Sequence, residues 1–213
     1  MHIPTIFDIN ITQKNHYEII DRKKIHHLKD VLRIKNGQTI NLSDGHGNLF
    51  IGIFNNNLIE ILESKNYKRT NDIKVFFPLL KNKDRFRFLI EKLTELCVSE
   101  IYIGKTEFTQ NSYVNEEKIS SWIIASIEQS GVPFIPKLNL VENIDFNIFD
   151  TCLDISGQPI KQHSEKINNF AVGPEGGWSN KELDSFDFIY SVSGFTLRVE
   201  TATLTAAALL MQN

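Results

Sequence analysis

The stretch of sequence that decides the fold runs from Lys74 to Cys97 and reads KVFFPLLKNKDRFRFLIEKLTELC. Residues 74–80 form an almost continuous apolar run, which is typical of a strand buried on both faces of a parallel sheet. Pro78 must lie near the end of this strand, because proline cannot donate to a central ladder. From Asp84 onward, apolar residues recur at helical spacing and predict an amphipathic helix over 84–97. A strand followed at once by a helix is the repeating unit of an α/β fold.

The sequence downstream repeats this alternation. Apolar runs predict strands near 100–103, 151–155, 169–172 and 188–192, with helices over about 116–130, after Trp178, and from about Glu200 to the end. Such alternation predicts a parallel sheet covered by helices on both faces. Ligands of such sheets bind beyond the carboxyl ends of the strands, so the loops after Val172 and Val192 are the expected binding loops.

The first sixty-odd residues show a different pattern. Short apolar runs separated by turn signals predict strands at 3–9, 38–45, 48–55 and 58–64, with one short helix around 27–32. Strands this short and numerous predict a small β-barrel. The polar segment NYKRTND (66–72) lacks periodicity and marks a domain boundary. The predicted domains are therefore 1–68 and 72–213.

The composition is that of an ordinary globular protein, with 41% hydrophobic and 23% charged residues among 213. No run approaches the roughly 20 apolar residues of a membrane span, and the N-terminus does not resemble a secretory signal. We therefore expect a cytoplasmic protein whose two cysteines, Cys97 and Cys152, are reduced. The histidines are scattered and no cysteine pair has zinc spacing, so we expect no metal site.

The net charge of −3 argues by itself against a nucleic-acid partner. The charges are unevenly distributed, however: basic residues outnumber acidic ones over 21–35 and 65–92, and acidic residues dominate over 139–191. This asymmetry permits a local phosphate-binding surface, although charge alone favours the plainer explanation of solvated faces.

The first expected binding loop reads AVGPEGGWS (171–179). Glycines let the backbone approach a ligand closely, and Ser179 with Glu182 predicts a capping box at the start of the next helix. An ordinary strand-to-helix turn explains the cap and one or two glycines. It does not explain an acid, Glu175, between glycines on the side where ligands bind. The loop has neither a P-loop nor a GxGxxG spacing, so a ligand site and a plain turn both stay open.

The second expected binding loop reads SGFTLRVETA (193–202). Glu200 near a helix N-terminus is stabilised by the helix dipole. Arg198 beside the same positive end requires an anionic partner, either phosphate or carboxylate.

Four basic residues crowd the junction between the strand at 74–80 and the helix that follows it. Because cations are disfavoured at helix N-termini, their concentration there favours contact with phosphate. These residues are Lys81, Lys83, Arg85 and Arg87.

The two loops, GPEGGWS (173–179) and LRVETA (197–202), resemble in this order the RsmE-like 16S rRNA uridine-N3 methyltransferases of the SPOUT superfamily. The resemblance extends over nearly the whole chain. It includes HHLKDVLRIKNGQTINLSDGHGNLF (26–50), KNKDRFRFLIEKLTELCVSEI (81–101) and SIEQSGVPFIPKL (126–138).

The resemblance implies an N-terminal PUA-like β-barrel for RNA and a C-terminal α/β domain with a deep trefoil knot. It implies methyl transfer from S-adenosylmethionine to N3 of a uridine in 16S rRNA of the small ribosomal subunit, by a homodimer. On this hypothesis the cofactor contacts are Gly173, Pro174, Gly176, Gly177, Ser193, Gly194, Leu197 and Thr201. The expected catalytic residues are Arg198, Glu175 and Glu200, and the expected RNA contacts are Arg33, Lys81, Lys83 and Arg85.

The chain departs from the family pattern at four positions. Cys97 stands where the family usually has glycine, Val132 and Thr5 stand where it often has arginine, and Val199 replaces the threonine of LRTETA. Two alternatives to the main reading stay open. One is a SPOUT methyltransferase acting on a ribose 2′-hydroxyl or a tRNA base, and the other is a non-catalytic RNA-binding assembly factor.

Overall fold

The computed structural model describes residues 3–11, 16–70, 72–109, 115–163 and 167–211. The chain divides into two compact units. The first contains Met1–Arg69 and Ile124–Ile135, and the second contains Thr70–Ile123 and Pro136–Asn213. Within the described residues, no helix is long and apolar enough to cross a membrane.

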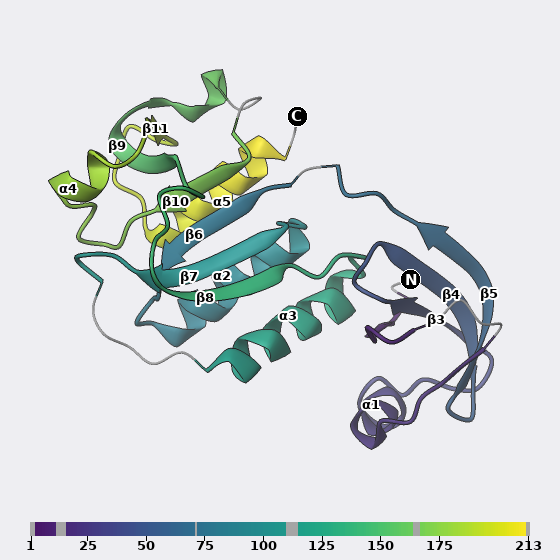
Figure 1. Cartoon of the computed structure of the whole chain (residues 1–213). Coiled ribbons are helices and arrows are strands. Elements are labelled where there is room, and N and C mark those ends of the chain that lie inside the picture. Colours follow the sequence, from purple (N-terminus) through teal and green to yellow (C-terminus); the bar gives the residue numbers. More distant parts are fainter. Residues whose placement is uncertain (1–2, 12–15, 71, 110–114, 164–166, 212–213) are drawn as a thin grey trace. The chain divides into compact units, whose positions relative to one another are not determined.

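The first unit is built on a curled five-stranded sheet (Figure 1) with the strand order β1-β3-β4-β5-β2. Only the pairing of β1 with β3 is parallel. A short helix, α1 (Arg22–His26), continues into a π-helical turn (His27–Val31). The strands are β1 (Thr5–Phe7), β2 (His16–Glu18), β3 (Gln38–Ser43), β4 (Asn48–Asn55) and β5 (Leu58–Asn66).

The predicted short strands at 38–45, 48–55 and 58–64 are confirmed as β3, β4 and β5. Their inward side chains form a core in which Ile40, Leu42 and Ile59 are fully buried. The helix predicted around 27–32 starts earlier, at Arg22. Its first five residues are mostly charged and show no apolar face, so periodicity does not detect them.

The second unit contains a six-stranded sheet in which every pairing is parallel, with the order β11-β9-β10-β6-β7-β8. The predicted α/β fold with a parallel sheet is confirmed; the knot stays a prediction. The strands are β6 (Lys74–Pro78), β7 (Glu100–Lys105), β8 (Lys137–Asn143), β9 (Thr151–Pro159), β10 (Asn169–Val172) and β11 (Phe188–Ser191). The helices are α2 (Lys83–Glu95), α3 (Glu116–Ser130), α4 (Asn180–Leu183) and α5 (Val199–Leu210).

Strand β6 lies in the middle of this sheet and is buried on both faces. Successive side chains Phe76 and Phe77 point to opposite faces and are both fully buried. Phe76 packs against Phe149 with ring centroids 5.9 Å apart, and Phe77 packs against Phe86 of α2 at 6.3 Å. Pro78 ends the strand, as its missing amide hydrogen requires.

Helix α2 ends in a Schellman motif whose turning residue is Cys97. The Val98 amide donates to the Leu93 carbonyl at 3.2 Å, and the Cys97 amide donates to Thr94 at 2.9 Å. Cys97 has a φ of 55°, in the left-handed region where glycine is preferred. Cysteine in place of the family's glycine therefore strains the backbone at this position.

We predict that Cys97→Gly stabilises the protein by about 0.5–1 kcal/mol, because glycine adopts this φ without a Cβ clash. The thermal midpoint should rise by roughly 1–4 °C, measured by calorimetry. Cys97→Ala is the matched control, since it removes the thiol but keeps Cβ, and it should give no increase. A lower midpoint for the glycine variant would contradict the prediction.

Candidate functional site

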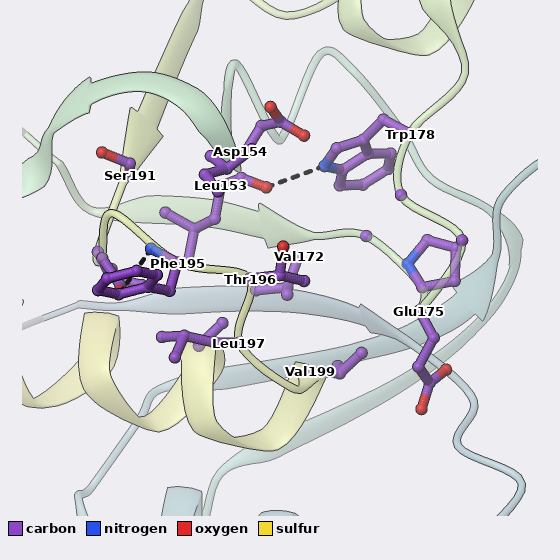
Figure 2. A pocket seen from close by; sticks show the side chains of 18 residues that line it. Leu153, Asp154, Val172, Glu175, Trp178, Ser191, Phe195, Thr196, Leu197 and Val199 are labelled. Atoms are coloured by element: carbon purple, nitrogen blue, oxygen red, sulfur yellow. Dashed lines mark hydrogen bonds between the residues drawn. The ribbon is translucent and has the colours of Figure 1, made fainter.

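Two loops at the carboxyl ends of β10 and β11 enclose a cavity of about 310 Å³ in the second unit (Figure 2). These are the two loops that the sequence identifies as binding loops. A third segment, at 153–155 on β9, completes the wall. The cavity therefore lies where ligands of parallel α/β sheets bind.

The loop after β10 is held against a buried indole. A Cβ on Gly173 would lie 3.0 Å from the Trp178 ring, so only glycine fits there without movement. Gly177 has a φ of 77°, and its amide donates to the Pro174 carbonyl at 2.9 Å. The Trp178 Nε1 donates to the Leu153 carbonyl at 3.1 Å, which ties the loop to β9. Gly173 and Gly177 thus allow the tight backbone conformation of this loop.

The predicted capping box is confirmed at the start of α4. The Glu182 amide donates to Ser179 Oγ at 3.3 Å, and the Ser179 amide donates to Glu182 Oε2 at 3.0 Å. The second oxygen of Glu182 accepts from the Glu107 amide at 2.9 Å. Helix α4 is a single turn, so these bonds fix where the glycine loop ends.

Strand β9 contributes to the cavity by leaving the sheet and returning to it. Its pairing with β11 jumps from Cys152 opposite Ile189 to Gln158 opposite Tyr190, so residues 153–157 leave the ladder with β11, while Leu153 still pairs with Val172 of β10. Asp154 lies in this bulge on the cavity wall, and its Oδ1 accepts from the Ser156 amide and hydroxyl at 2.9 and 2.6 Å. Gly157 lets the strand return, since a Cβ there would lie 2.6 Å from the β11 backbone.

Arg85 of α2 connects the two binding loops by contacting a glutamate of each. Arg85 donates through Nε and Nη2 to the two oxygens of Glu200 at 2.7 and 2.6 Å, and its Nη2 lies 3.2 Å from Glu175 Oε1. The Glu200 residue is only 9% exposed, whereas Glu175 is exposed. The hydrogen bonds that Arg85 donates lower the pKa of Glu200, and the same bonds raise the pKa of Arg85. Glu200 is therefore a fixed anion with a committed partner.

Most of the predicted cofactor contacts gather in the cavity. Gly194 and Thr201 do not line it, although both adjoin residues that do. The predicted contacts that line the cavity are Gly173, Pro174, Gly176, Gly177, Ser193 and Leu197.

The predicted catalytic residues lie around the same cavity. Glu175 lines it, and Arg198 is exposed at the N-cap of α5, directly after Leu197. Glu200 lies behind the lining, against Arg85. The predicted RNA contacts Lys81 and Lys83 are exposed at the start of α2, and Arg33 is exposed in the first unit.

Sequence reasoning assigned no role to Asp154, Trp178 or Phe195, all of which line the cavity. Phe195 is 82% exposed, although its amide is held by Ser193 Oγ at 3.1 Å. For Phe195, the available sequence signal was an aromatic residue within the otherwise polar segment SGFT (193–196). For Asp154 the signal was an acid directly after the buried end of an apolar strand. A cavity with apolar walls, backbone groups and two carboxylates, Asp154 and Glu175, suits a flat ligand that carries hydroxyl or cationic groups.

Comparisons with known proteins agree with this geometry. Residues 67–211 match the sequence model of an RNA methyltransferase domain family, and residues 20–61 match that of an RNA methyltransferase PUA domain. A ribosomal RNA small subunit methyltransferase E from Rickettsia conorii is 26% identical over 93% of this chain and 90% of its own.

Two solved structures share the fold over almost the whole chain. A predicted RNA methyltransferase from Thermotoga maritima has a TM-score of 0.75 and 27% identity, covering 98% of both chains. A ribosomal RNA small subunit methyltransferase E from Neisseria gonorrhoeae, bound to S-adenosyl methionine, has a TM-score of 0.81 and 21% identity, covering 99% of this chain and 98% of its own.

We predict that Glu200→Gln lowers the free energy of unfolding at pH 7 by about 1.5–3 kcal/mol, because it breaks a charged two-point hydrogen bond. The pKa of Glu200 is lower in the folded state than its ordinary value of 4.5. Its contribution is therefore complete above pH 4.5 and is lost as the pH falls through the folded pKa. Denaturant unfolding at pH 7 and pH 3.5 should show the difference between wild type and variant shrinking.

The pair of Arg87, which is exposed, and Glu91, which is half-buried, provides the control on α2, with a distance of 2.7 Å. Glu91→Gln should cost no more than about 0.5 kcal/mol, as is usual for surface pairs. If the Glu200→Gln deficit were the same at both pH values, packing rather than charge would account for it.

Proposed function

Because the chain belongs to the RNA methyltransferase family whose model matches residues 67–211, we propose that it methylates N3 of a uridine in 16S rRNA with S-adenosylmethionine as donor. One observation carries this proposal. The cavity between the two glycine-bearing loops lies in a chain whose relatives, over 85–93% of its length, are named ribosomal RNA small subunit methyltransferases. We further propose that residues 72–213 are the catalytic domain and that residues 1–68 bind RNA.

The cavity residues fit the chemical groups of S-adenosylmethionine. The backbone of 173–177 and of 193–197 supplies amides and carbonyls for an adenine edge, and the apolar side chains of Leu197 and Val172 face the same space. Asp154 supplies a carboxylate for ribose hydroxyls or for a positive charge. When bound, the cofactor supplies a methyl group on a positively charged sulfur.

Glu175 is the proposed proton acceptor for the uracil N3–H. It lines the cavity and is exposed, and it holds Arg85 through one contact at 3.2 Å. Glu200 is a poorer base, since two hydrogen bonds from Arg85 lower its pKa. We therefore assign Glu200 and Arg85 to positioning Glu175 rather than to proton transfer.

The charges of the proposed reaction balance within the site. Uracil N3 loses its proton to Glu175 and gains the methyl carbon, while the carbon–sulfur bond electrons stay on sulfur. One negative and one positive charge disappear together, so the low-dielectric cavity undergoes no net change of charge. Arg198, exposed beside Leu197 at the start of α5, is placed to stabilise negative charge on the uracil oxygens.

The partners of the protein follow from the same proposal. N3 lies on the pairing edge, so the uridine must be unpaired or swung out, and basic side chains such as Arg33 and Lys81 would contact phosphate. We also propose a cytoplasmic homodimer. Helix α5 supports this point, because Leu204, Ala208 and Leu209 are only partly buried within the single chain.

The decisive experiment uses labelled S-adenosylmethionine, purified enzyme, and small ribosomal subunits that lack the modification. We expect 3-methyluridine as the only labelled nucleoside when the digested RNA is analysed by mass spectrometry. A 2′-O-methylated nucleoside, or transfer only to tRNA, would contradict the proposed acceptor and support the alternative RNA substrates. Cofactor binding without transfer to any RNA would support the non-catalytic alternative.

Two single variants separate chemistry from cofactor binding. Glu175→Gln should lower kcat by roughly 10²–10⁴-fold, as expected for loss of a general base, with the Kd for S-adenosylmethionine within about twofold of wild type. Asp154→Ala should show the opposite pattern, with the Kd raised about tenfold or more by loss of a charged hydrogen bond. Calorimetric titration and single-turnover transfer measure the two quantities. If each variant lost transfer rate and cofactor affinity equally, the separate roles proposed for Glu175 and Asp154 would be wrong.

A further inference from the structure

The basic residues at the start of α2 divide into two groups that face opposite ways. Side chains two positions apart in a helix point about 200° apart, whereas those four apart share a face. Arg85 points to Glu200 and Glu175 beside the cavity. Lys83 and Arg87 therefore lie on the other side of the same helical turn.

Helix α3 brings a third cation to that side. The Trp122 ring packs edge-on against Phe86 of α2 with centroids 5.8 Å apart. Lys118 lies one turn before Trp122, with its Nζ 6.0 Å from the centre of the indole ring. Lys118 thus stands beside the first turn of α2, and its hydrogen bonding with Lys83, with repulsion from Lys83 and Arg87, lowers the pKa of Lys118. We call Lys83, Arg87 and Lys118 the basic cluster.

The basic cluster has an excess of positive charge. Arg87 is paired with Glu91, but among the described residues neither Lys83 nor Lys118 has a carboxylate within ion-pair distance. Both lysines are exposed, and each lies in the first turn of its helix, where cations are disfavoured. Like charges in such a place cost stability unless an anion binds them.

We propose that the basic cluster binds phosphates of the RNA strand next to the target uridine, so that this strand crosses the N-terminus of α2. This inference rests on the proposed function for its substrate. A helix with its side chains is about 10–12 Å wide, so the path from Arg85 to the cluster spans about three stacked nucleotides at roughly 3.4 Å each. The cations lie on two helices in an open surface. Lys83 and Lys118 approach each other, and Arg87 lies one turn further along α2, so the cluster can contact successive phosphates of a chain.

The test is the salt dependence of RNA binding by the triple variant Lys83→Gln/Arg87→Gln/Lys118→Gln. The probe is purified 16S rRNA without the modification, and its Kd is measured by filter binding over a range of salt concentrations. Each lost phosphate contact reduces the slope of log K against log salt by about 0.7 for single-stranded RNA. We expect the slope to fall by about 2 and the Kd at low salt to rise at least tenfold, with cofactor affinity unchanged.

The matched control removes three other exposed lysines of the same unit: Lys105→Gln/Lys161→Gln/Lys181→Gln. This variant has the same net charge and should keep the wild-type slope. A cluster variant with the wild-type slope would overturn the proposal, and so would equal reductions in both variants, which would indicate a general charge effect. Absence of RNA binding by the wild type would overturn it as well.

Binding and methyl transfer are measured separately, so failure of the two proposals can be distinguished. If the slope changes but no 3-methyluridine forms, the basic cluster still binds RNA and only the proposed uridine N3 acceptor is wrong. Restoring charge with Lys83→Arg/Lys118→Arg should restore the slope, since each phosphate contact depends on a positive charge. A slope as low as that of the glutamine variant would overturn the proposal, because the positive charges are kept in this variant.

Discussion

The guanidinium of Arg85 connects three parts of the chain that are far apart in sequence. It leaves the first turn of α2, holds Glu200 at the start of α5 with two hydrogen bonds, and reaches Glu175 in the glycine loop. A carboxylate as buried as Glu200 needs such a partner, because an unpaired buried charge is costly. The interaction therefore fixes the relative positions of both binding loops. The arrangement of the cavity, and of Glu175 beside it, depends on this one ion pair.

A second constraint acts on the same glycine loop through Trp178. The Trp178 indole fills the space beside Gly173 and reaches the Leu153 carbonyl, so the loop cannot collapse into the cavity or swing away from β9. Methyl transfer in line with a leaving sulfur depends strongly on alignment, and a preformed site supplies that alignment before the substrate arrives. The buried tryptophan and the half-buried arginine thus limit the loops from two sides.

The sequence predicts well the parts of this structure that depend on local patterns. The buried strand at β6, the helix after it and the capping box at Ser179 follow from apolar spacing and cap chemistry, and the structure confirms them. Strand β8 was missed, because it lies at the sheet edge with partly exposed side chains and lacks a continuous apolar run. The partners of Arg85 could not be predicted, since Glu200 is 115 positions away and no local pattern joins them. The same limit hid Asp154, whose place depends on a register shift between strands.

The bulge in β9 has a consequence for how such proteins diverge. Pairing with β11 is regular up to Cys152 and resumes at Gln158. Of the residues between them, Leu153 pairs with β10, and Asp154 and Ile155 line the cavity without a partner strand in the described part of the chain. Substitutions at residues 154–156 therefore leave the strand pairing of the sheet intact on both sides. Substitutions there can therefore reshape the pocket at small cost to folding, whereas any side chain at Gly157 would place its Cβ 2.6 Å from the β11 backbone and displace the strand. Specificity can evolve here independently of stability.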